Sequence, residues 1–147
     1  MKKNRIRPLA ICIFRNNDRI LVAEGYDPVK KEIFYRPLGG AIEFGEYSGQ
    51  TIHRELMEEI GAEVRDLKYL GTLENVFVFN GNPGHEIVQV YDGVLEESGL
   101  YGQAEIQGNE ADVGESFKAV WKRISDFVEG KSTLYPSGLL DLMRQYS

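Results

Sequence analysis

Few features of this chain suggest secretion or a membrane. The sequence has a single cysteine, Cys12, so no internal disulfide can form, and it lies in an apolar run from Leu9 to Phe14, where we expect a buried, unreactive thiol. No apolar run approaches the ~20 residues that a transmembrane helix requires. The basic residues 1–5 precede only a short apolar run without a small-residue cleavage pattern, which is unlike a signal peptide. We therefore expect a soluble, cytoplasmic protein without a membrane partner.

Positive charge is also in short supply. The sequence has 17 Lys and Arg residues against 23 Asp and Glu residues, a formal net charge of −6 at pH 7. A protein that binds nucleic acid without sequence specificity needs a basic stripe, so this balance argues against nucleic acid as a partner. An acidic protein can still bind a phosphorylated small molecule where a local positive charge is present, and a bound metal ion would supply one.

Length and composition favour one globular domain. The 147 residues suit a single domain, and 42% hydrophobic residues with 27% charged residues argue against disorder. The sequence shows no internal repeat, low-complexity segment or linker, so we expect residues 1–147 to form one domain.

Apolar patterns predict a mixture of strands and helices. The segments 74–79 and 85–95 alternate around the turn residues 80–84, which is typical of a hairpin. The polar, acidic segment 96–115 predicts a long loop. The other expected elements are strands over 8–14, 19–24, 32–35 and 117–121 and within 63–78, a short helix over 124–128 and a terminal helix opened by Pro136. This mixture indicates one layered α/β or α+β domain.

A longer helix is predicted over residues 48–60. Ser48 is a suitable N-cap, and Gly61 is a suitable residue to end the helix in the left-handed conformation. Apolar residues recur at every fourth position and would pack on the core, namely Ile52, Leu56 and Ile60.

Three glutamates of this helix form an arrangement that needs a counter-charge. Glu55, Glu58 and Glu59 are spaced so that a helix sets them on one face. Like charges at these spacings destabilise a helix by roughly 0.2–0.5 kcal/mol per pair. They also lie near the helix C-terminus, where the macrodipole disfavours anions. A divalent cation between the carboxylates would reverse the sign of both effects, so we infer a metal site rather than a solvated charged face.

The segment from Gly40 to Ala62 resembles the signature of the Nudix hydrolases. That signature reads Gly-x5-Glu-x7-Arg-Glu-U-x-Glu-Glu-x-Gly-U, where U is a bulky aliphatic residue. The chain matches it at Gly40, Glu46, Arg54, Glu55, Leu56, Glu58, Glu59 and Gly61. The departure is Ala62, which is smaller than the usual aliphatic residue and should affect packing more than chemistry. A match of this length is far more specific than a lone glycine motif.

The resemblance implies a fold and a reaction. The fold is an α/β/α sandwich with a mixed sheet, in which the segment 40–62 forms a loop–helix–loop. The reaction is hydrolysis of a pyrophosphate linkage in a nucleoside diphosphate joined to another group, with Mg²⁺ or Mn²⁺ as cofactor. Phosphoryl transfer depends mainly on positioning and charge stabilisation, so no covalent nucleophile is required.

The resemblance also assigns roles to individual residues. Catalytic and metal-binding roles fall on Glu55, Glu58 and Glu59, and the carbonyl group of Gly39 is a further metal ligand. Arg54 and Glu46 correspond to a structural ion pair that fixes the loop against the helix, beside Gly40. These roles agree with the preference of Mg²⁺ for oxygen ligands and for one or two carboxylates together with substrate phosphates.

The sequence leaves the general base open. Glu55 or Glu59 could deprotonate a metal-bound water. Three glutamates outside the segment are further candidates for the base or for substrate contact, although each taken alone is more simply a solvated surface carboxylate: Glu86, Glu110 and Glu115. Arg7 and Arg36 could each reach a phosphate.

Aromatic residues and histidines have simpler interpretations. Several rings could stack on a nucleobase, but their strand periodicity is typical of core residues: Tyr35, Phe77, Phe79 and Tyr91. His53 is expected on the surface of the helix and His85 in strand packing, because Mg²⁺ favours oxygen over nitrogen.

The leading hypothesis is therefore a metal-dependent pyrophosphohydrolase. Its substrate would be a nucleoside triphosphate, a nucleotide sugar, ADP-ribose or a dinucleoside polyphosphate. One alternative is a hydrolase of a non-nucleotide pyrophosphate or of an RNA 5′ end, although the acidic composition weighs against RNA. The other is a non-catalytic sensor of a nucleotide or other ligand, against which the intact carboxylate set argues. Oligomeric state is left open, and a homodimer is among the arrangements that the sequence allows.

Overall fold

The computed structural model describes residues 4–110 and 114–146. Its elements are β1 (Ile6–Asn16), β2 (Arg19–Asp27), β3 (Glu32–Ala41), α1 (Ser48–Ile60), β4 (Val64–Phe79), β5 (Asn82–Leu95), a 3₁₀ helix (Ser98–Gly102), β6 (Glu105–Glu110), β7 (Glu115–Arg123), α2 (Ile124–Val128), β8 (Thr133–Leu134) and α3 (Leu139–Arg144). None of the helices in these two ranges is both long enough and apolar enough to cross a membrane.

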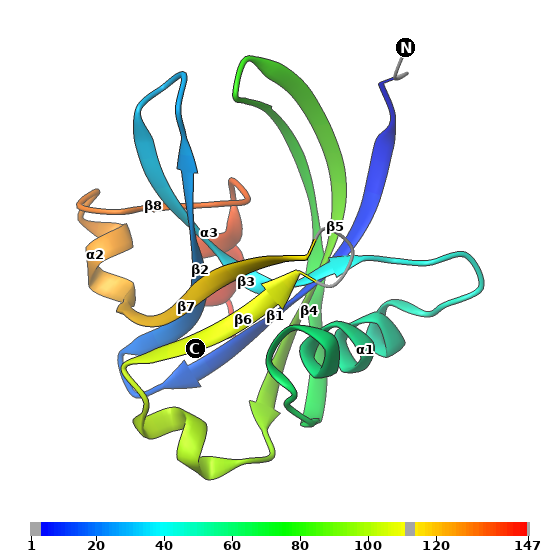
Figure 1. The fold of residues 1–147 in the computed structure, drawn as a ribbon, viewed down its shortest axis with the longest axis vertical. Coiled ribbons are helices and arrows are strands. Elements are labelled where there is room, and N and C mark those ends of the chain that lie inside the picture. Colours follow the sequence, from blue (N-terminus) through cyan, green and yellow to red (C-terminus); the bar gives the residue numbers. More distant parts are fainter. Residues whose placement is uncertain (1–3, 111–113, 147) are drawn as a thin grey trace.

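The described strands form one mixed sheet (Figure 1). Seven of them follow the order β4-β5-β1-β3-β2-β7-β6, and β8 pairs with β3. Most neighbours are antiparallel, whereas β1 runs parallel to β5 and β3 runs parallel to β8. The predicted hairpin of β4 and β5 is confirmed, with Asn80 and Gly81 between the strands.

The central strand β1 shows why the domain has three layers. Residues 9–14 of this strand are all buried, and successive side chains point to opposite faces of the sheet. The even-numbered residues of the run pack in a cluster with α1, and the odd-numbered residues pack in a second cluster with α2 and α3. Helices therefore cover both faces, and the predicted α/β/α sandwich is confirmed (Figure 1). Cys12 is fully buried in the first cluster, as expected.

Helix α1 has the predicted length, but its N-cap differs from the prediction. Ser48 is already helical, and Tyr47 occupies the N-cap position with extended backbone angles of φ −75° and ψ 150°. The N–H of Tyr47 donates to Oε1 of Gln50 at 2.8 Å, while the Ser48 hydroxyl is hydrogen-bonded to the hydroxyl of Tyr91. Gly61 ends the helix at φ 65°, as predicted.

The prediction of a long loop over residues 96–115 was wrong. This segment holds the 3₁₀ helix and strand β6, which pairs with β7 from Glu105↔Val120 to Glu110↔Glu115. Ile106 and Gly108 are buried, whereas the other residues of β6 are exposed and polar. The strand therefore becomes evident only from its pairing with β7. Residues 111–113 of the segment lie outside the described residues.

Two other boundaries also differ from the predictions. Strand β3 does not end at Tyr35 but continues to Ala41, because its second half pairs with β1. The terminal helix starts at Leu139 rather than at Pro136, and Gly138 at φ 89° occupies its N-cap position.

Candidate active site

Helix α1 places the three glutamates at the edge of a cavity. Glu55 and Glu59 are buried, whereas the side chain of Glu58 is 40% exposed. Ile52 and Leu56 anchor the adjacent face of α1 in the core. The helix therefore holds two carboxylates in the interior and a third at the cavity edge.

Two glycines at the end of β3 allow this strand to approach α1. A Cβ atom at Gly40 would overlap the carboxyl group of Glu55, and a Cβ atom at Gly39 would overlap the carbonyl oxygen of Ala10. Gly39 also has a φ of 150°, which side-chain-bearing residues rarely adopt. Glycine at both positions thus sets the backbone of β3 directly against the glutamates.

Arg54 ties the helix to the preceding loop. Its Nε donates to Oε2 of Glu46 at 2.9 Å, and its Nη2 donates to Oε1 of the same carboxylate at 3.0 Å. Nη2 also donates to the carbonyl of Ala41 at 2.9 Å, and Nη1 donates to Oε1 of Glu55 at 2.8 Å. One guanidinium group thus connects α1, its loop, the end of β3 and a candidate metal ligand.

The contacts of Glu46 fix its charge. Hydrogen bonds from Arg54 and from the hydroxyl of Thr51 lower the pKa of Glu46 to about 2. The resulting carboxylate keeps the loop closed on the helix at all ordinary pH values.

Glu59 has the opposite electrostatic environment. Burial, followed by the negative charges of Glu110 and Glu55, raises the pKa of Glu59 to about 9. The backbone N–H of Gly39 and the charge of Arg36 act in the other direction. Among the residues that the structure describes, Oε1 of Glu59 is buried without a hydrogen-bond partner. These residues therefore give the carboxylate too little positive charge to offset its burial.

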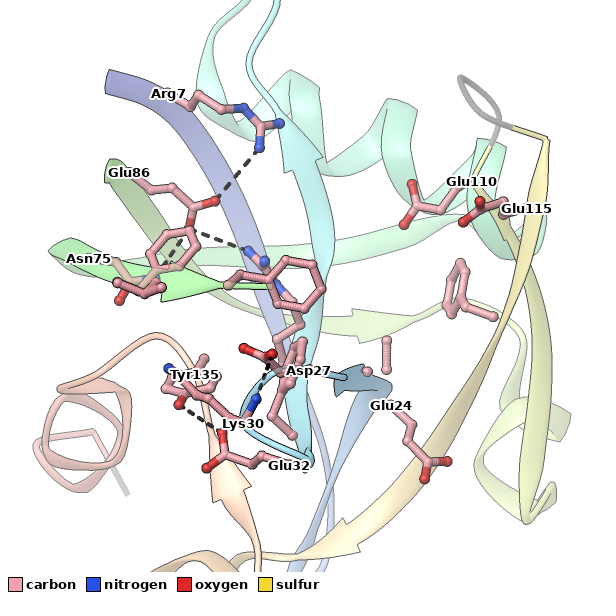
Figure 2. A pocket seen from close by; sticks show the side chains of 18 residues that line it. Arg7, Glu24, Asp27, Lys30, Glu32, Asn75, Glu86, Glu110, Glu115 and Tyr135 are labelled. Carbon is pink, nitrogen blue, oxygen red and sulfur yellow. Dashed lines mark hydrogen bonds and ion pairs between the residues drawn. The ribbon is translucent and has the colours of Figure 1, made fainter. Parts of the chain in front are cut away.

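The glutamates predicted outside the helix have distinct surroundings. Glu86 is buried rather than solvated, and its carboxylate lies 3.8 Å from Nη1 of Arg7 and 3.7 Å from Nη2 of Arg36 (Figure 2). Nδ2 of Asn75 also donates to it at 3.2 Å. Sequence reasoning missed Asn75 and the burial of Glu86, because the partners come from three strands that no local pattern connects.

Glu110 and Glu115 are exposed partners at the end of the β6–β7 hairpin, side by side in Figure 2. Glu110 also acts on the helix, since its charge raises the pKa of Glu55 and of Glu59. Glu110 lines the same cavity as the three helix glutamates, whereas Glu115 does not line that cavity.

The site consists of two adjoining cavities. The first, here called the carboxylate cavity, has a volume of about 270 Å³ and is lined by the three helix glutamates together with Gly39 and Gly40. The second, the aromatic cavity, has a volume of about 460 Å³ and is lined largely by hairpin residues (Figure 2). Both cavities share Arg7, Ala23, Arg36, Glu86, Glu110 and Phe117. The arginines thus lie at the junction.

The aromatic residues divide between core and cavity. Tyr35 and Tyr91 pack against the core clusters, as predicted. Phe77 and Phe79 instead line the aromatic cavity with three rings that the sequence analysis did not single out: Phe34, Phe117 and Tyr135. His53 is exposed on α1, and His85 lies in β5 paired with Ile6.

Comparison with known proteins identifies the family. A family model described as NUDIX domain matches residues 4–135. The chain belongs to the NUDIX domain family.

Curated relatives of this NUDIX domain are longer proteins. The NAD-capped RNA hydrolase NudC of Pseudomonas syringae pv. tomato is 35% identical over 68 residues, which cover 46% of this chain and 24% of that protein. NudC of Mycobacterium tuberculosis is 30% identical over 112 residues, which cover 70% of this chain and 35% of that protein. The matched region therefore spans about a quarter to a third of these relatives.

Solved structures show the same fold. A NUDIX hydrolase from Nitrosomonas europaea superposes with a TM-score of 0.66 at 16% sequence identity, covering 97% of this chain and 88% of that one. At this level of identity, the likeness concerns the fold alone.

The residues of this NUDIX domain fit a divalent cation, which the family generally uses. Within residues 4–110 and 114–146, no three His, Cys, Asp or Glu side chains already converge as a ligand cluster. Nη1 of Arg54 donates instead to Glu55 and also to Oε2 of Glu58 at 3.3 Å. Oε1 of Glu59, which has no hydrogen-bond partner among the described residues, is nevertheless an oxygen ligand of the type that Mg²⁺ prefers. A cation at this position would satisfy that buried oxygen and offset the charge of Glu110.

Proposed function

We propose that this NUDIX domain hydrolyses a pyrophosphate linkage in a nucleoside diphosphate derivative with Mg²⁺ or Mn²⁺. The observation that carries the proposal is the carboxylate cavity, where three helix glutamates line a space that continues to Arg7 and Arg36. Glu55, Glu58, Glu59 and the carbonyl of Gly39 would hold the cation. Bound there, a divalent cation would neutralise phosphate charge and lower the pKa of a coordinated water.

The residues of the chain have complementary roles in the proposed reaction. Arg7 and Arg36 lie at the junction of the cavities and would hold phosphate oxygens, since both side chains are partly exposed. Arg54 would hold Glu55 and the loop in fixed positions through its hydrogen bonds to Glu55, Glu46 and the carbonyl of Ala41.

The attacking water forms a new bond to one phosphorus, while the bond from that phosphorus to the bridging oxygen breaks and the bridging oxygen leaves with the second phosphate. The proton released by the water passes to a carboxylate. Glu55, Glu59, Glu86 and Glu110 are the candidates, because all four line the carboxylate cavity.

A substrate panel tests the proposal directly. The purified protein would be incubated with Mg²⁺ and nucleoside triphosphates, ADP-ribose, nucleotide sugars, NADH and dinucleoside polyphosphates, with products separated by chromatography. We expect metal-dependent cleavage of at least one nucleotide by the wild type and cleavage at least about a hundredfold slower by Glu59→Gln. Equal rates for the two proteins would refute the assignment of the site. Metal-dependent binding without any cleavage would support a sensor instead.

The names of the relatives suggest a second candidate substrate, a capped RNA 5′ end. The relatives described above are named NAD-capped RNA hydrolases. The net charge of −6 opposes a long RNA, because phosphate contacts dominate such binding. Measuring kcat/KM for NADH and for NAD-capped RNA side by side would decide. A higher value for the RNA would favour the second candidate.

A further inference from the structure

Three hairpins contribute phenylalanines to the aromatic cavity in the same way. Phe34 of β3 lies opposite Gly25 of β2, and Phe77 of β4 lies opposite Gly84 of β5. The third phenylalanine, Phe117 of β7, lies opposite Gly108 of β6. At each of the three glycines, a Cβ atom would overlap the ring of the opposite phenylalanine. Each ring therefore lies over the backbone of its partner strand, in space that only glycine leaves open.

These rings form part of a wider aromatic wall. Phe34 contacts Phe79 edge-on, with ring centroids 5.8 Å apart, and contacts Tyr135 at 5.5 Å. Phe34, Phe77 and Phe117 are only partly buried, although they lie within a folded sheet. Exposed aromatic rings around one cavity favour a planar partner, because stacking is available on their faces.

The negative charges around the aromatic wall disfavour a phosphate group beside most of its rings. Carboxylates surround it, namely Glu24, Asp27, Glu32, Glu110 and Glu115, whereas the arginines lie where the carboxylate cavity begins. Lys30 is the further basic residue on the described lining, near the turn between β2 and β3. A negatively charged group is therefore favoured at the junction and disfavoured beside the rings.

We propose that the aromatic cavity binds the nucleobase of the substrate, and that the three glycine–phenylalanine pairs set the selectivity for it. This inference rests on the proposed function and adds the location of the base and the residues that select it. The base is planar and uncharged and lies among the rings, while the pyrophosphate extends past Arg7 and Arg36 to the helix glutamates. Sugar diphosphates without a base would lack this stacking.

The first test is a binding measurement that needs neither metal nor turnover. Calorimetry in EDTA would compare the four common nucleoside monophosphates with ribose 5-phosphate as the base-free probe. We expect at least one nucleotide to bind about tenfold or more tightly than ribose 5-phosphate, the size of one stacking interaction. If none binds more tightly than ribose 5-phosphate, the inference is wrong.

Variants then locate the site. Phe34→Leu removes one ring, and Gly25→Ala displaces the same ring without a backbone penalty, because Gly25 does not have a positive φ. We expect either change to weaken nucleotide binding about tenfold and to leave the affinity for ribose 5-phosphate unchanged. Matched controls are Phe44→Leu, at a fully exposed ring outside both cavities, and Gly102→Ala, where a Cβ atom meets nothing within 4 Å.

Kinetics separate this inference from the proposed function. If the wild type hydrolyses ADP-ribose, Gly25→Ala should raise KM with little change in kcat, because Gly25 lines the aromatic cavity and not the carboxylate cavity of the helix glutamates. Unchanged KM and unchanged nucleotide affinity in both variants would refute the inference while leaving the hydrolase intact. A wild type that cleaves nothing would refute the proposed function, and the calorimetry would still decide where the base binds.

Discussion

The two adjoining cavities are built in different ways. Most of the carboxylate cavity comes from one continuous stretch, in which residues 36–41 lead into a loop and then into α1. The aromatic cavity comes from β1, β2, β3, β4, β5, β6 and β7 together with Lys30 and Tyr135. If the proposed roles hold, the residues for chemistry are encoded locally in the sequence, whereas the residues for selectivity are assembled from distant hairpins.

The largest effect is expected in the carboxylate cavity. Glu59→Gln should lower kcat by at least about a hundredfold, since one carboxylate is lost from the cavity that would hold the metal ion and accept the proton. KM for the nucleotide should change little, because the aromatic cavity is untouched. The neutral amide also avoids burying a charge, so the fold should persist.

Thermal unfolding tests the same variant without a measurement of activity. Mg²⁺ should raise the Tm of the wild type in proportion to its binding, and it should raise that of Glu59→Gln less. Equal Mg²⁺-induced shifts in the two proteins would show that Glu59 does not contribute to metal binding.

An intermediate effect is expected for Arg54→Lys. A lysine cannot contact Glu46, Glu55 and the Ala41 carbonyl at the same time, so the glutamates lose their fixed orientation. Loss of such supporting contacts typically lowers activity about 10–100-fold. Arg65→Lys is the matched control, because Arg65 pairs with Asp66 and Glu96 on an exposed surface. Equal rates for the two variants would contradict the role of Arg54.

A smaller effect is expected at the far end of the aromatic cavity. Buried Asp27 accepts hydrogen bonds from the N–H groups of Val29 and Lys30 in its own hairpin and from that of Asn80 in the β4–β5 hairpin. Both hairpins extend from the same end of the sheet (Figure 1). Asp27→Asn should raise KM several-fold and lower the Tm, with kcat retained. The exposed change Asp141→Asn is the control, and a fall in kcat alone would refute this interpretation.

The smallest effect concerns stability at acid pH. The pKa of Glu46 is about 2 in the folded protein, below the ordinary value of 4.5. Its contribution is therefore fully present above about pH 4.5 and is lost as the pH falls towards about 2. Urea unfolding across this window should show a decline in the free energy of unfolding of the wild type and a shallower decline for Glu46→Gln. Parallel curves would mean that Glu46 has an ordinary pKa.

The parts of the fold that the sequence predicted depend on nearby residues. Helix α1 followed from the spacing of Ile52 and Leu56 and from Gly61, all within one segment. The β4–β5 hairpin followed from its turn residues. In both elements, the interactions that decide the structure join residues close in sequence, which pattern reasoning can detect.

The parts that escaped prediction depend on distant partners. Strand β6 has a polar outer face, and glycine, as at its inward position Gly108, has a low strand propensity. In the folded chain the ring of Phe117 lies against Gly108, a contact that the sequence does not reveal. Glu86 looked like a surface carboxylate because Arg7 and Arg36, which approach it in the folded chain, lie on other strands. Phe34 was overlooked for the same reason, since its role appears only beside Phe79 and Tyr135.

The burial of Cys12 has a practical consequence. Its side chain is fully covered at the centre of β1, and burial raises its pKa well above the ordinary value, so alkylating reagents can react only when the sheet opens. As the single thiol in the sequence, it makes the rate of modification a direct reporter of global opening. A fluorophore attached to a cysteine introduced on the β2–β3 or the β4–β5 hairpin would label that position alone, so Cys12 would not have to be replaced.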